Sequence, residues 1–316
     1  MTETGKGILA MISAAGLWGI SPLYYKLLSH IPAAEVMAHR TVWSLVFFAG
    51  LLAFQGRLGE MGSVLRNPRR FGLIILASLM VSTNWFLFIY ATLTDRNTET
   101  SLGYYIYPLV AVLVGRFAFG ERLGVAQWLS VSLAAGAVAV LAFGLGALPW
   151  ISLTLAATFS LYGVIKKLLP VGPIVSVTCE VLVAVPITLA VLFWLYARGE
   201  VNLTYSTVDM LLLIASGPIT AFPLILFTIA ARRVPMTTVG LLQYLNPTLQ
   251  FFCAVVLFGE IFTPYHQIAF PMIWIGLAIY SVATLRQDRV ARRASMAVVG
   301  VSTQVTNSAS EASAKP

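Results

Sequence analysis

Long apolar stretches, each about 20 residues long, recur along the chain from Ile8 to Leu285 and are bounded by charged residues, Pro or Gly. A helix of ~20 residues spans the ~30 Å hydrocarbon core of a bilayer. Only helices and closed barrels satisfy every backbone hydrogen bond in that core. Barrel strands would alternate apolar and polar residues over ~10 positions, and these stretches do not alternate. The sequence therefore predicts an all-α, polytopic membrane protein.

Ten such stretches are present, and we expect each of them to be a transmembrane helix. They cover residues 8–28, 35–55, 71–92, 100–119, 125–145, 149–168, 173–197, 209–231, 236–257 and 266–285. Only 10% of the residues are charged, whereas ~25% is usual in a soluble domain. The first stretch is too long for a signal peptide and ends without a small-x-small site, so we expect it to be retained. The polar segment 287–316 is expected to be a disordered cytoplasmic tail.

The net charge of +8 is explained by topology. If the N-terminus is cytoplasmic, most of the 20 Lys and Arg residues fall in the segments on the cytoplasmic side. This is the positive-inside pattern, which predicts that both termini are cytoplasmic in a bacterial-type inner membrane. The expected partner is the lipid bilayer and not a nucleic acid, and the formation of a homodimer stays open.

One motif occurs twice. The stretch YPLVAVLVGRFAFGE places Pro108 where NPTLQFFCAVVLFGE places Pro247, and Gly120 where the second copy has Gly259. Five predicted helices make one unit, so residues 7–146 and 147–286 form two repeats, with 287–316 left as the tail. Because five is odd, the second repeat enters the membrane from the opposite side. Inverted repeats of this kind usually build alternating access around a midplane site, although a duplication without a transport role would give the same pattern.

The paired P-x10-FGE motif, with WGISPLYYKLL and AEVMAHRTVWS near the N-terminus, resembles the EamA domains of the drug/metabolite transporter superfamily, in its RarD branch. This branch is often labelled as chloramphenicol-sensitivity proteins or permeases. The resemblance covers about residues 7–286 and implies transport of a small organic solute, such as an amino-acid-like or amphenicol-like molecule. The family often has Gln-x-x-Gly at the start of each terminal helix. This chain has Gln127 with Ser130, and His266 with Ala269.

Ionisable residues at membrane depth are functional candidates. His39 and Arg40 lie roughly 8 Å into the second stretch, and Glu180 lies at the matching depth of the seventh, which enters from the other side. We therefore expect separate gating or coupling sites and no Arg40–Glu180 ion pair. Arg40 could instead snorkel to the outer interface. Glu180 has no cation nearby in its own stretch, so it could carry a proton or make a structural hydrogen bond, and His39 could also carry a proton.

Polar and aromatic residues near the midplane are the candidates for substrate binding. They gather in the middle of several stretches and before the two repeated prolines, where we expect helix kinks that free a carbonyl. An aromatic wall with a few amides and hydroxyls suits a largely apolar, hydrogen-bonding ligand, although the same residues could simply hold helices together. The candidates are Trp18, Asn84, Trp85, Tyr104, Tyr107, Tyr162, Gln243, Tyr244 and Asn246.

Glycines have structural roles in this interpretation. Gly19 and Gly163 permit close helix approach, whereas Gly120 and Gly259 end helices ahead of tight turns.

The sequence contains no Walker A, HExxH, CxxC or GxSxG motif, so we expect a protein that is not an enzyme and that carries no cofactor or metal. Cys179 and Cys253 fall inside predicted helices and are expected to be unpaired core residues. The alternative to a transporter is a non-transporting membrane sensor or scaffold built on the same duplicated bundle.

Overall fold

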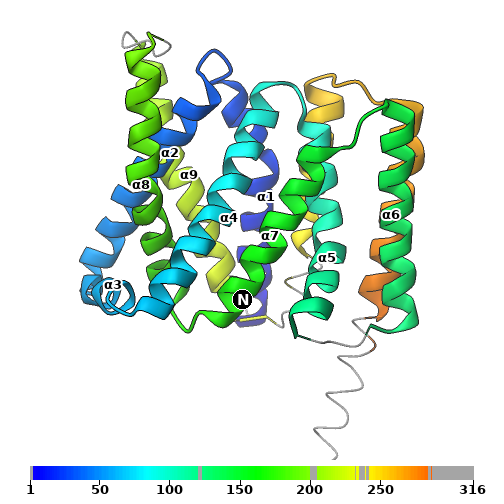
Figure 1. The fold of residues 1–316 in the computed structure, drawn as a ribbon, viewed down its shortest axis with the longest axis horizontal. Coiled ribbons are helices and arrows are strands. Elements are labelled where there is room, and N and C mark those ends of the chain that lie inside the picture. Colours follow the sequence, from blue (N-terminus) through cyan, green and yellow to red (C-terminus); the bar gives the residue numbers. More distant parts are fainter. Residues whose placement is uncertain are drawn as a thin grey trace, which may run out of the picture.

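The fold is an all-helical bundle. The computed structural model describes residues 3–119, 123–199, 205–231, 233–234, 239, 242–283 and 286. All regular structure in these ranges is helical, which confirms the all-α prediction for them. Figure 1 shows the long helices side by side, each running from one end of the bundle to the other.

The helix bounds follow the apolar stretches, except in the ninth stretch, 236–257, which has a turn at Tyr244 and a π-helical turn after Phe252. The first half contains α1 (Glu3–Lys26), α2 (Ala33–Phe54), α4 (Pro68–Leu93), α5 (Asn97–Phe119) and α6 (Val125–Leu145). The second half contains α7 (Trp150–Leu168), α8 (Pro173–Ala197), α9 (Thr207–Ala231), α11 (Leu245–Phe252) with a π-helical turn η1 (Cys253–Leu257), and a last helix, Pro264–Ala283. Seven helices among the described residues are long and apolar enough to cross a membrane. That all ten stretches cross it stays a prediction.

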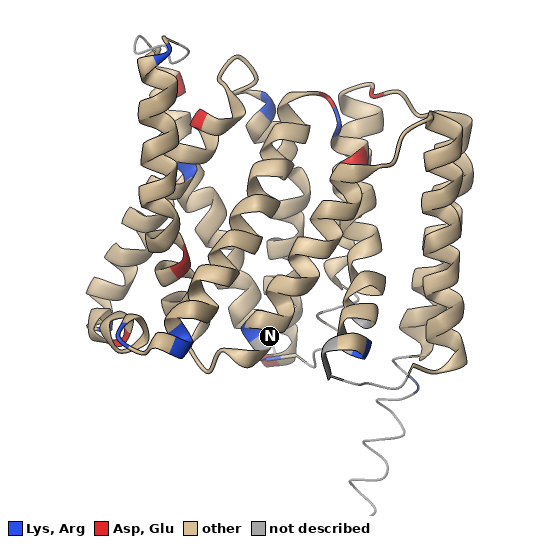
Figure 2. Cartoon of the chain, in the orientation of Figure 1, with Lys and Arg blue, Asp and Glu red and all other residues tan. Residues whose placement is uncertain are grey.

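A short helix that the sequence analysis did not predict, α3 (Leu58–Leu65), lies between α2 and α4. We call its end of the bundle the α3 end. Glu3 and Arg233 meet there, with Arg233 Nε 2.9 Å from Glu3 Oε2. We call the opposite end the Lys26 end, where Lys26 pairs with Asp95. Figure 2 shows that Lys, Arg, Asp and Glu lie mainly at these two ends, with long uncharged stretches of helix between them.

The start of α5 is capped by a residue distant in the sequence. The carboxylate of Glu260, which closes the second P-x10-FGE motif, accepts hydrogen bonds from the backbone N–H groups of Asn97 and Thr98, both at 2.7 Å. The first N–H groups of a helix have no partner within it, and the helix dipole favours negative charge there. Glu260 thus joins the two halves at the Lys26 end. Glu121, its counterpart in the first motif, lies outside the described residues.

The two repeated prolines have different surroundings. A turn at Tyr244 interrupts the helix before α11, so Pro247 lies in the first turn of α11, where a missing N–H is tolerated. The kinks expected at the two prolines stay predictions. In the first copy α5 continues as one helix with Pro108 inside it.

The predicted roles of the glycines hold only in part. A Cβ on Gly19 would lie 2.6 Å from Leu249 Cβ, so Gly19 does permit the close approach of α1 and α11. Gly163 has nothing within 4 Å of such a Cβ, so the prediction that it permits close helix packing is wrong. Gly259 follows η1 with φ of 66°, as expected for a helix-ending glycine. Gly120 lies outside the described residues.

The last helix runs antiparallel to α6 and packs against it closely. Ideal Cβ atoms on Gly144, Gly136 and Gly276 would lie 2.2 Å from Tyr265, 2.9 Å from Met272 and 3.1 Å from the Ser130 carbonyl. The departures from the family pattern at Ser130 and at Ala269, which is fully buried, therefore do not prevent close packing.

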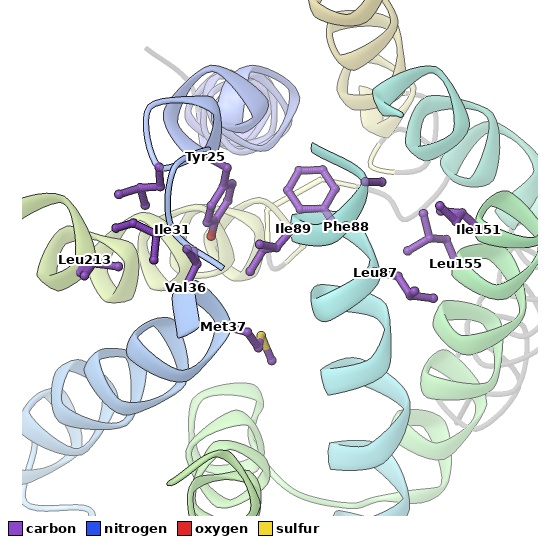
Figure 3. Packing of buried hydrophobic residues seen from close by; sticks show 12 residues of the cluster. Tyr25, Ile31, Val36, Met37, Leu87, Phe88, Ile89, Ile151, Leu155 and Leu213 are labelled. Carbon is purple, nitrogen blue, oxygen red and sulfur yellow. The ribbon is translucent and has the colours of Figure 1, made fainter. Parts of the chain in front are cut away.

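A large aliphatic and aromatic cluster fills the space between α1, α2, α4, α7 and α9 near the Lys26 end. Figure 3 shows Tyr25, Ile31, Val36 and Leu213 gathered on one side of this cluster, and Phe88 on the other side of Ile89. Cys179 and Cys253 are buried and unpaired, as the sequence predicted.

The contact between α2 and α9 depends on Gly217. A Cβ on Gly217 would lie 2.5 Å from the backbone C and O of Trp43, whereas Gly163 on α7 is open. We predict that Gly217→Ala lowers the free energy of unfolding by about 2–3 kcal/mol, because the helices must separate. The matched control Gly163→Ala should be neutral or stabilising by up to ~1 kcal/mol. Thermal melts of the purified protein in detergent would measure both, and equal melting temperatures for the two variants would contradict the assigned contact.

Candidate functional site

Arg40 on α2 is a buried cation without an acid beside it. Its side chain is 6% exposed, and its Nε donates a hydrogen bond to Thr220 Oγ1 on α9 at 2.8 Å. The guanidinium carbon lies 4.3 Å from the ring centroid of Trp85 and 5.7 Å from that of Tyr25. Within the described ranges, no carboxylate lies within ion-pair distance of it. Snorkelling to the outer interface is therefore wrong, and Arg40 is held inside the bundle by two rings and a hydroxyl.

Glu180 on α8 forms a second buried polar cluster. Its carboxylate accepts hydrogen bonds from Lys166 Nζ at 2.6 Å, Ser176 Oγ at 2.6 Å and Tyr162 OH at 3.0 Å. The sequence analysis found no cation near Glu180 in its own stretch and counted Lys166 only as a topology signal. The structure corrects this, because the neighbouring helix α7 supplies the cation.

Arg40 and Glu180 form no ion pair with each other in the described part of the chain, and each has its own partners. His39 is half-buried, and the described residues give it no hydrogen bond. The gating or coupling roles of these three residues stay predictions.

Asn84 joins three helices. It is fully buried on α4, and its Nδ2 donates hydrogen bonds to the Leu155 carbonyl at 2.9 Å and to Thr158 Oγ1 at 3.1 Å on α7. Its Oδ1 accepts a hydrogen bond from Tyr104 OH on α5 at 2.9 Å. Both amide protons are used, so a substrate can gain them only if these helices move apart.

Phe159 on α7 is a central residue that the sequence analysis missed. Its ring centroid lies 5.0 Å from that of Tyr107, 6.1 Å from Tyr104 and 5.9 Å from Tyr162. The structure thus brings three of the predicted aromatic candidates together around an unpredicted one. Its position three residues before Tyr162, on the same helix face, was the signal that could have found it.

Aromatic rings connect the two buried charges. Phe88 lies between Tyr25 and Tyr104, with centroid distances of 5.8 Å and 6.3 Å. Because Tyr25 lies against Arg40 and Tyr162 bonds Glu180, a continuous run of rings through Tyr104 and Phe159 joins the Arg40 and Glu180 sites. Such a run offers apolar surface with a few hydroxyls.

The remaining candidates lie elsewhere in the bundle. Trp18 packs on Phe227 of α9 at 6.0 Å between centroids. Tyr244 packs against the cluster shared by α5, α6 and the last helix. Asn246 is 7% exposed and its Oδ1 accepts a hydrogen bond from Gln250 Nε2 at 2.8 Å. Gln243 is half-buried. These residues do not join the Arg40 site by any described contact.

The Lys26 end of the bundle is tied shut by contacts between segments. Beyond the Lys26–Asp95 pair, His30 Nε2 lies 3.1 Å from Asp209 Oδ1 at the start of α9. Tyr205 OH donates a hydrogen bond to Glu35 Oε2 at 2.7 Å. Glu35 is only 1% exposed. Together with the Glu260 cap, these contacts join α1, α2, α5 and α9.

The α3 end has a cleft. It has a volume of about 600 Å³ between the ends of α2, α8 and α9 and is lined by Gln55, Arg57, Ile174, Ile225, Thr228, Ile229 and Arg233. The buried side chains of Phe48, Val177, Val181 and Ala221 pack together between these helices. Along α2 the order is Arg40, then Phe48, then Gln55, two turns apart each time. An apolar plug therefore separates the cleft from Arg40.

In the part of the chain that the structure describes, no three His, Cys, Asp or Glu side chains gather to hold a metal ion.

The sequence has clear relatives. The model of the EamA-like transporter family matches residues 5–143. The chain is 42% identical over 291 residues to "Protein RarD" of Streptomyces exfoliatus, covering 92% of each protein. It is 41% identical over 286 residues to an "Uncharacterized transporter" of Pseudomonas aeruginosa, covering 90% of this chain and 96% of that one.

A solved structure described only as "Crystal structure of protein" matches with a TM-score of 0.57 and 20% identity. The match covers 90% of this chain and 99% of that one. At this identity it shows that nearly the whole chain shares an experimentally observed fold.

The Lys166–Glu180 pair gives a stability prediction. We expect Glu180→Gln to lower the free energy of unfolding by about 2–3 kcal/mol, because Lys166 is then left without its acid in a largely buried site. Lys166→Met combined with Glu180→Gln should recover much of that loss. The matched control is Glu60→Gln, which breaks the exposed Arg57–Glu60 pair and should change stability by less than about 1 kcal/mol. Chemical or thermal unfolding in detergent measures all three, and no rescue by the double variant would contradict the pairing.

Proposed function

The chain belongs to the EamA-like transporter family, in its RarD branch, and is a multi-pass inner-membrane transporter of the drug/metabolite type; from this premise we propose that it moves a small organic solute by alternating access. The transport is secondary. The solute is bound between the two halves, at the buried polar and aromatic residues that connect Arg40 and Glu180.

The proposed inverted repeats, residues 7–146 and 147–286, are supported by the way the helices pack. The repeat pairs α1 with α7, α2 with α8, α4 with α9 and α5 with α11. In the structure the contact of α5 with α7 has its counterpart in the contact of α11 with α1. The contact of α4 with α7 likewise corresponds to that of α9 with α1. The contact of α4 with α8 corresponds to that of α9 with α2. These three contacts between the halves thus each have an exchanged counterpart, as expected for two units related by a pseudo-twofold axis in the membrane plane.

One observation supports alternating access above the others: the two ends of the bundle differ. Two ion pairs and the Glu260 cap join segments at the Lys26 end, whereas at the α3 end the Glu3–Arg233 pair lies beside a cleft of about 600 Å³. An apolar plug around Phe48 stands between the cleft and Arg40. We expect this arrangement in a transporter whose binding site is closed toward one side of the membrane, while a cleft from the other side reaches part of the way to the site. By the positive-inside rule, the α3 end faces the cytoplasm.

The proposed substrate contacts are Trp85, Tyr104, Tyr107 and Tyr162, with Phe159 added at their centre. Trp18, Asn84, Gln243, Tyr244 and Asn246 stay proposals that require the helices to rearrange. Glu180, bonded to Lys166, is the proposed coupling residue if transport follows a proton gradient, with His39 as the second candidate.

The rival function is a membrane sensor or scaffold that transports nothing. Purified protein in proteoliposomes distinguishes the two. Labelled amino acids, amphenicols, small amines and monocarboxylates are offered with and without an imposed pH gradient. Saturable uptake supports transport, and its response to the gradient separates proton coupling from facilitated movement. Absence of uptake for every class in correctly inserted protein favours the rival.

A disulfide across the Lys26 end tests the alternating movement. In a background where Cys179 and Cys253 are alanine, we predict that the double variant His30→Cys/Asp209→Cys loses transport on oxidation and regains it on reduction. The crosslink joins the first half to α9 and prevents that end from opening. The control pair Ser206→Cys/Asp209→Cys, whose native side chains hydrogen-bond within one segment at 2.8 Å, should transport equally in both states. Full transport by the oxidised His30/Asp209 pair would contradict the movement.

A further inference from the structure

Two buried polar groups on one face of α2 have no partner in the structure. Arg40 Nη1 and Ser44 Oγ are both buried without a hydrogen bond. The two residues are one helical turn apart, so their side chains lie on the same helix face. Arg40 is 6% exposed and Ser44 is fully buried. Buried polar groups are nearly always hydrogen-bonded, so two orphans in one place require an explanation.

The other hydroxyl groups along this contact between α2 and α9 are satisfied. Thr41 Oγ1 donates to the Met37 carbonyl, Ser216 Oγ to the Leu213 carbonyl and Thr220 Oγ1 to the Ser216 carbonyl. Local helix bonds of this kind are available to any buried Ser or Thr. The interface is therefore not poorly packed in general, and the missing partners belong to Arg40 and Ser44 alone within this contact.

The guanidinium of Arg40 stays positively charged even though it is buried. A guanidinium is not deprotonated in proteins, and it presents five N–H donors in a fixed fork. One of these donors reaches Thr220, and two rings cover the guanidinium. Ring faces attract a cation but accept no strong hydrogen bond. The bundle holds the positive charge in place without neutralising it, in contrast to Lys166, which has Glu180.

We propose that Arg40 and Ser44 bind the carboxylate of the transported solute, which is a monocarboxylate with an apolar or aromatic body. This inference rests on the proposed transport function. A carboxylate offers two acceptor oxygens in the plane that the guanidinium fork matches, and the serine hydroxyl supplies a further donor. The carboxylate replaces the partners that the protein itself leaves out.

The surroundings define the rest of the solute. A dianionic phosphate would need a second cation, but Lys166 is paired with Glu180 and Lys26 is paired with Asp95. An ammonium group would need a free acid, but Glu35 is bonded by Tyr205. The rings of Trp85 and Tyr25 next to Arg40, and the ring of Phe88 against Tyr25, supply apolar surface. A single carboxylate on an apolar body fits these groups.

Both approaches to this site are closed by apolar side chains in the structure. The plug around Phe48 covers it toward the α3 end, and the cluster of Figure 3, with Tyr25, Val36 and Leu213, covers it toward the Lys26 end. The orphan groups are therefore shielded from water as well as from acids. A carboxylate that enters by movement of one plug gains hydrogen bonds that water does not compete for.

The test is ligand-dependent thermal stabilisation of the purified full chain in detergent. The probes are benzoate, phenylacetate, 3-phenylpropanoate and 4-methylpentanoate, each beside its neutral amide. At least one carboxylate should raise the melting temperature saturably while its amide does not. Arg40→Gln should weaken that binding at least about tenfold, and Arg40→Lys should bind with intermediate strength because the fork is lost. The control Arg116→Gln removes an exposed arginine of α5 and should bind as the wild type does.

Each outcome decides the matter. Equal stabilisation by a carboxylate and its amide, or none from any of the four carboxylates, overturns the inference. If Arg40→Gln does not fold, Ser44→Ala and Arg40→Lys carry the comparison, and unchanged carboxylate binding in both overturns it. Counterflow of the stabilising carboxylate in proteoliposomes tests the proposed function separately. If binding depends on Arg40 but no counterflow occurs, the carboxylate site stands and the transport function is rejected. If neutral solutes are taken up and Arg40→Gln does not affect their uptake, the transport function stands and the carboxylate site is rejected.

Discussion

In the core of a bilayer every backbone N–H and C=O must find its partner within the protein, and the architecture follows from that constraint. Helices satisfy this constraint along most of the described chain, and the segments that depart from a regular helix pack against other helices. The turn at Tyr244 and the π-helical turn Cys253–Leu257 flank α11, which packs on α1 and α5. The N–H groups at the start of α5, which have no partner within the helix, donate to the carboxylate of Glu260 from the other half. The same contact that satisfies the backbone thus ties the two halves together.

Charges inside the bundle are treated in two different ways. Glu180 is neutralised by Lys166 and further bonded by Tyr162 and Ser176. Arg40 is held by Thr220 and the faces of two rings, and it keeps a donor without a partner. A buried ion pair needs no ligand, whereas an unpaired buried cation is costly unless something completes it. This difference is why Arg40 is assigned to the solute and Glu180 to coupling.

Hydropathy was sufficient to locate the long helices but not the short helix α3, because the length of a long apolar stretch is a local property of the sequence. Side-chain contacts between different helices were harder to predict, since they depend on which helices become neighbours. Lys166 was counted for topology but pairs with Glu180 on the next helix. Arg40 was left between two interpretations, because its burial depends on α9 and α4. The repeated motif ending in Glu260 was visible in the sequence, yet its role as a helix cap needed the distant start of α5 beside it. Gly163 was assigned a packing role that depended on a neighbour which is not there.

The central claim is that the two halves rock so that the ends of the bundle open in turn. Distances between paired spin labels just beyond the ends of α2 and α9 test it most directly, with Gln55 and Arg233 labelled at the α3 end and Pro32 and Ser206 labelled at the Lys26 end. All four positions are exposed, and both pairs join the first half to the second. The account predicts that conditions which shorten the Gln55–Arg233 distance lengthen the Pro32–Ser206 distance. Distances that stay fixed, or that rise and fall together, would contradict alternating access.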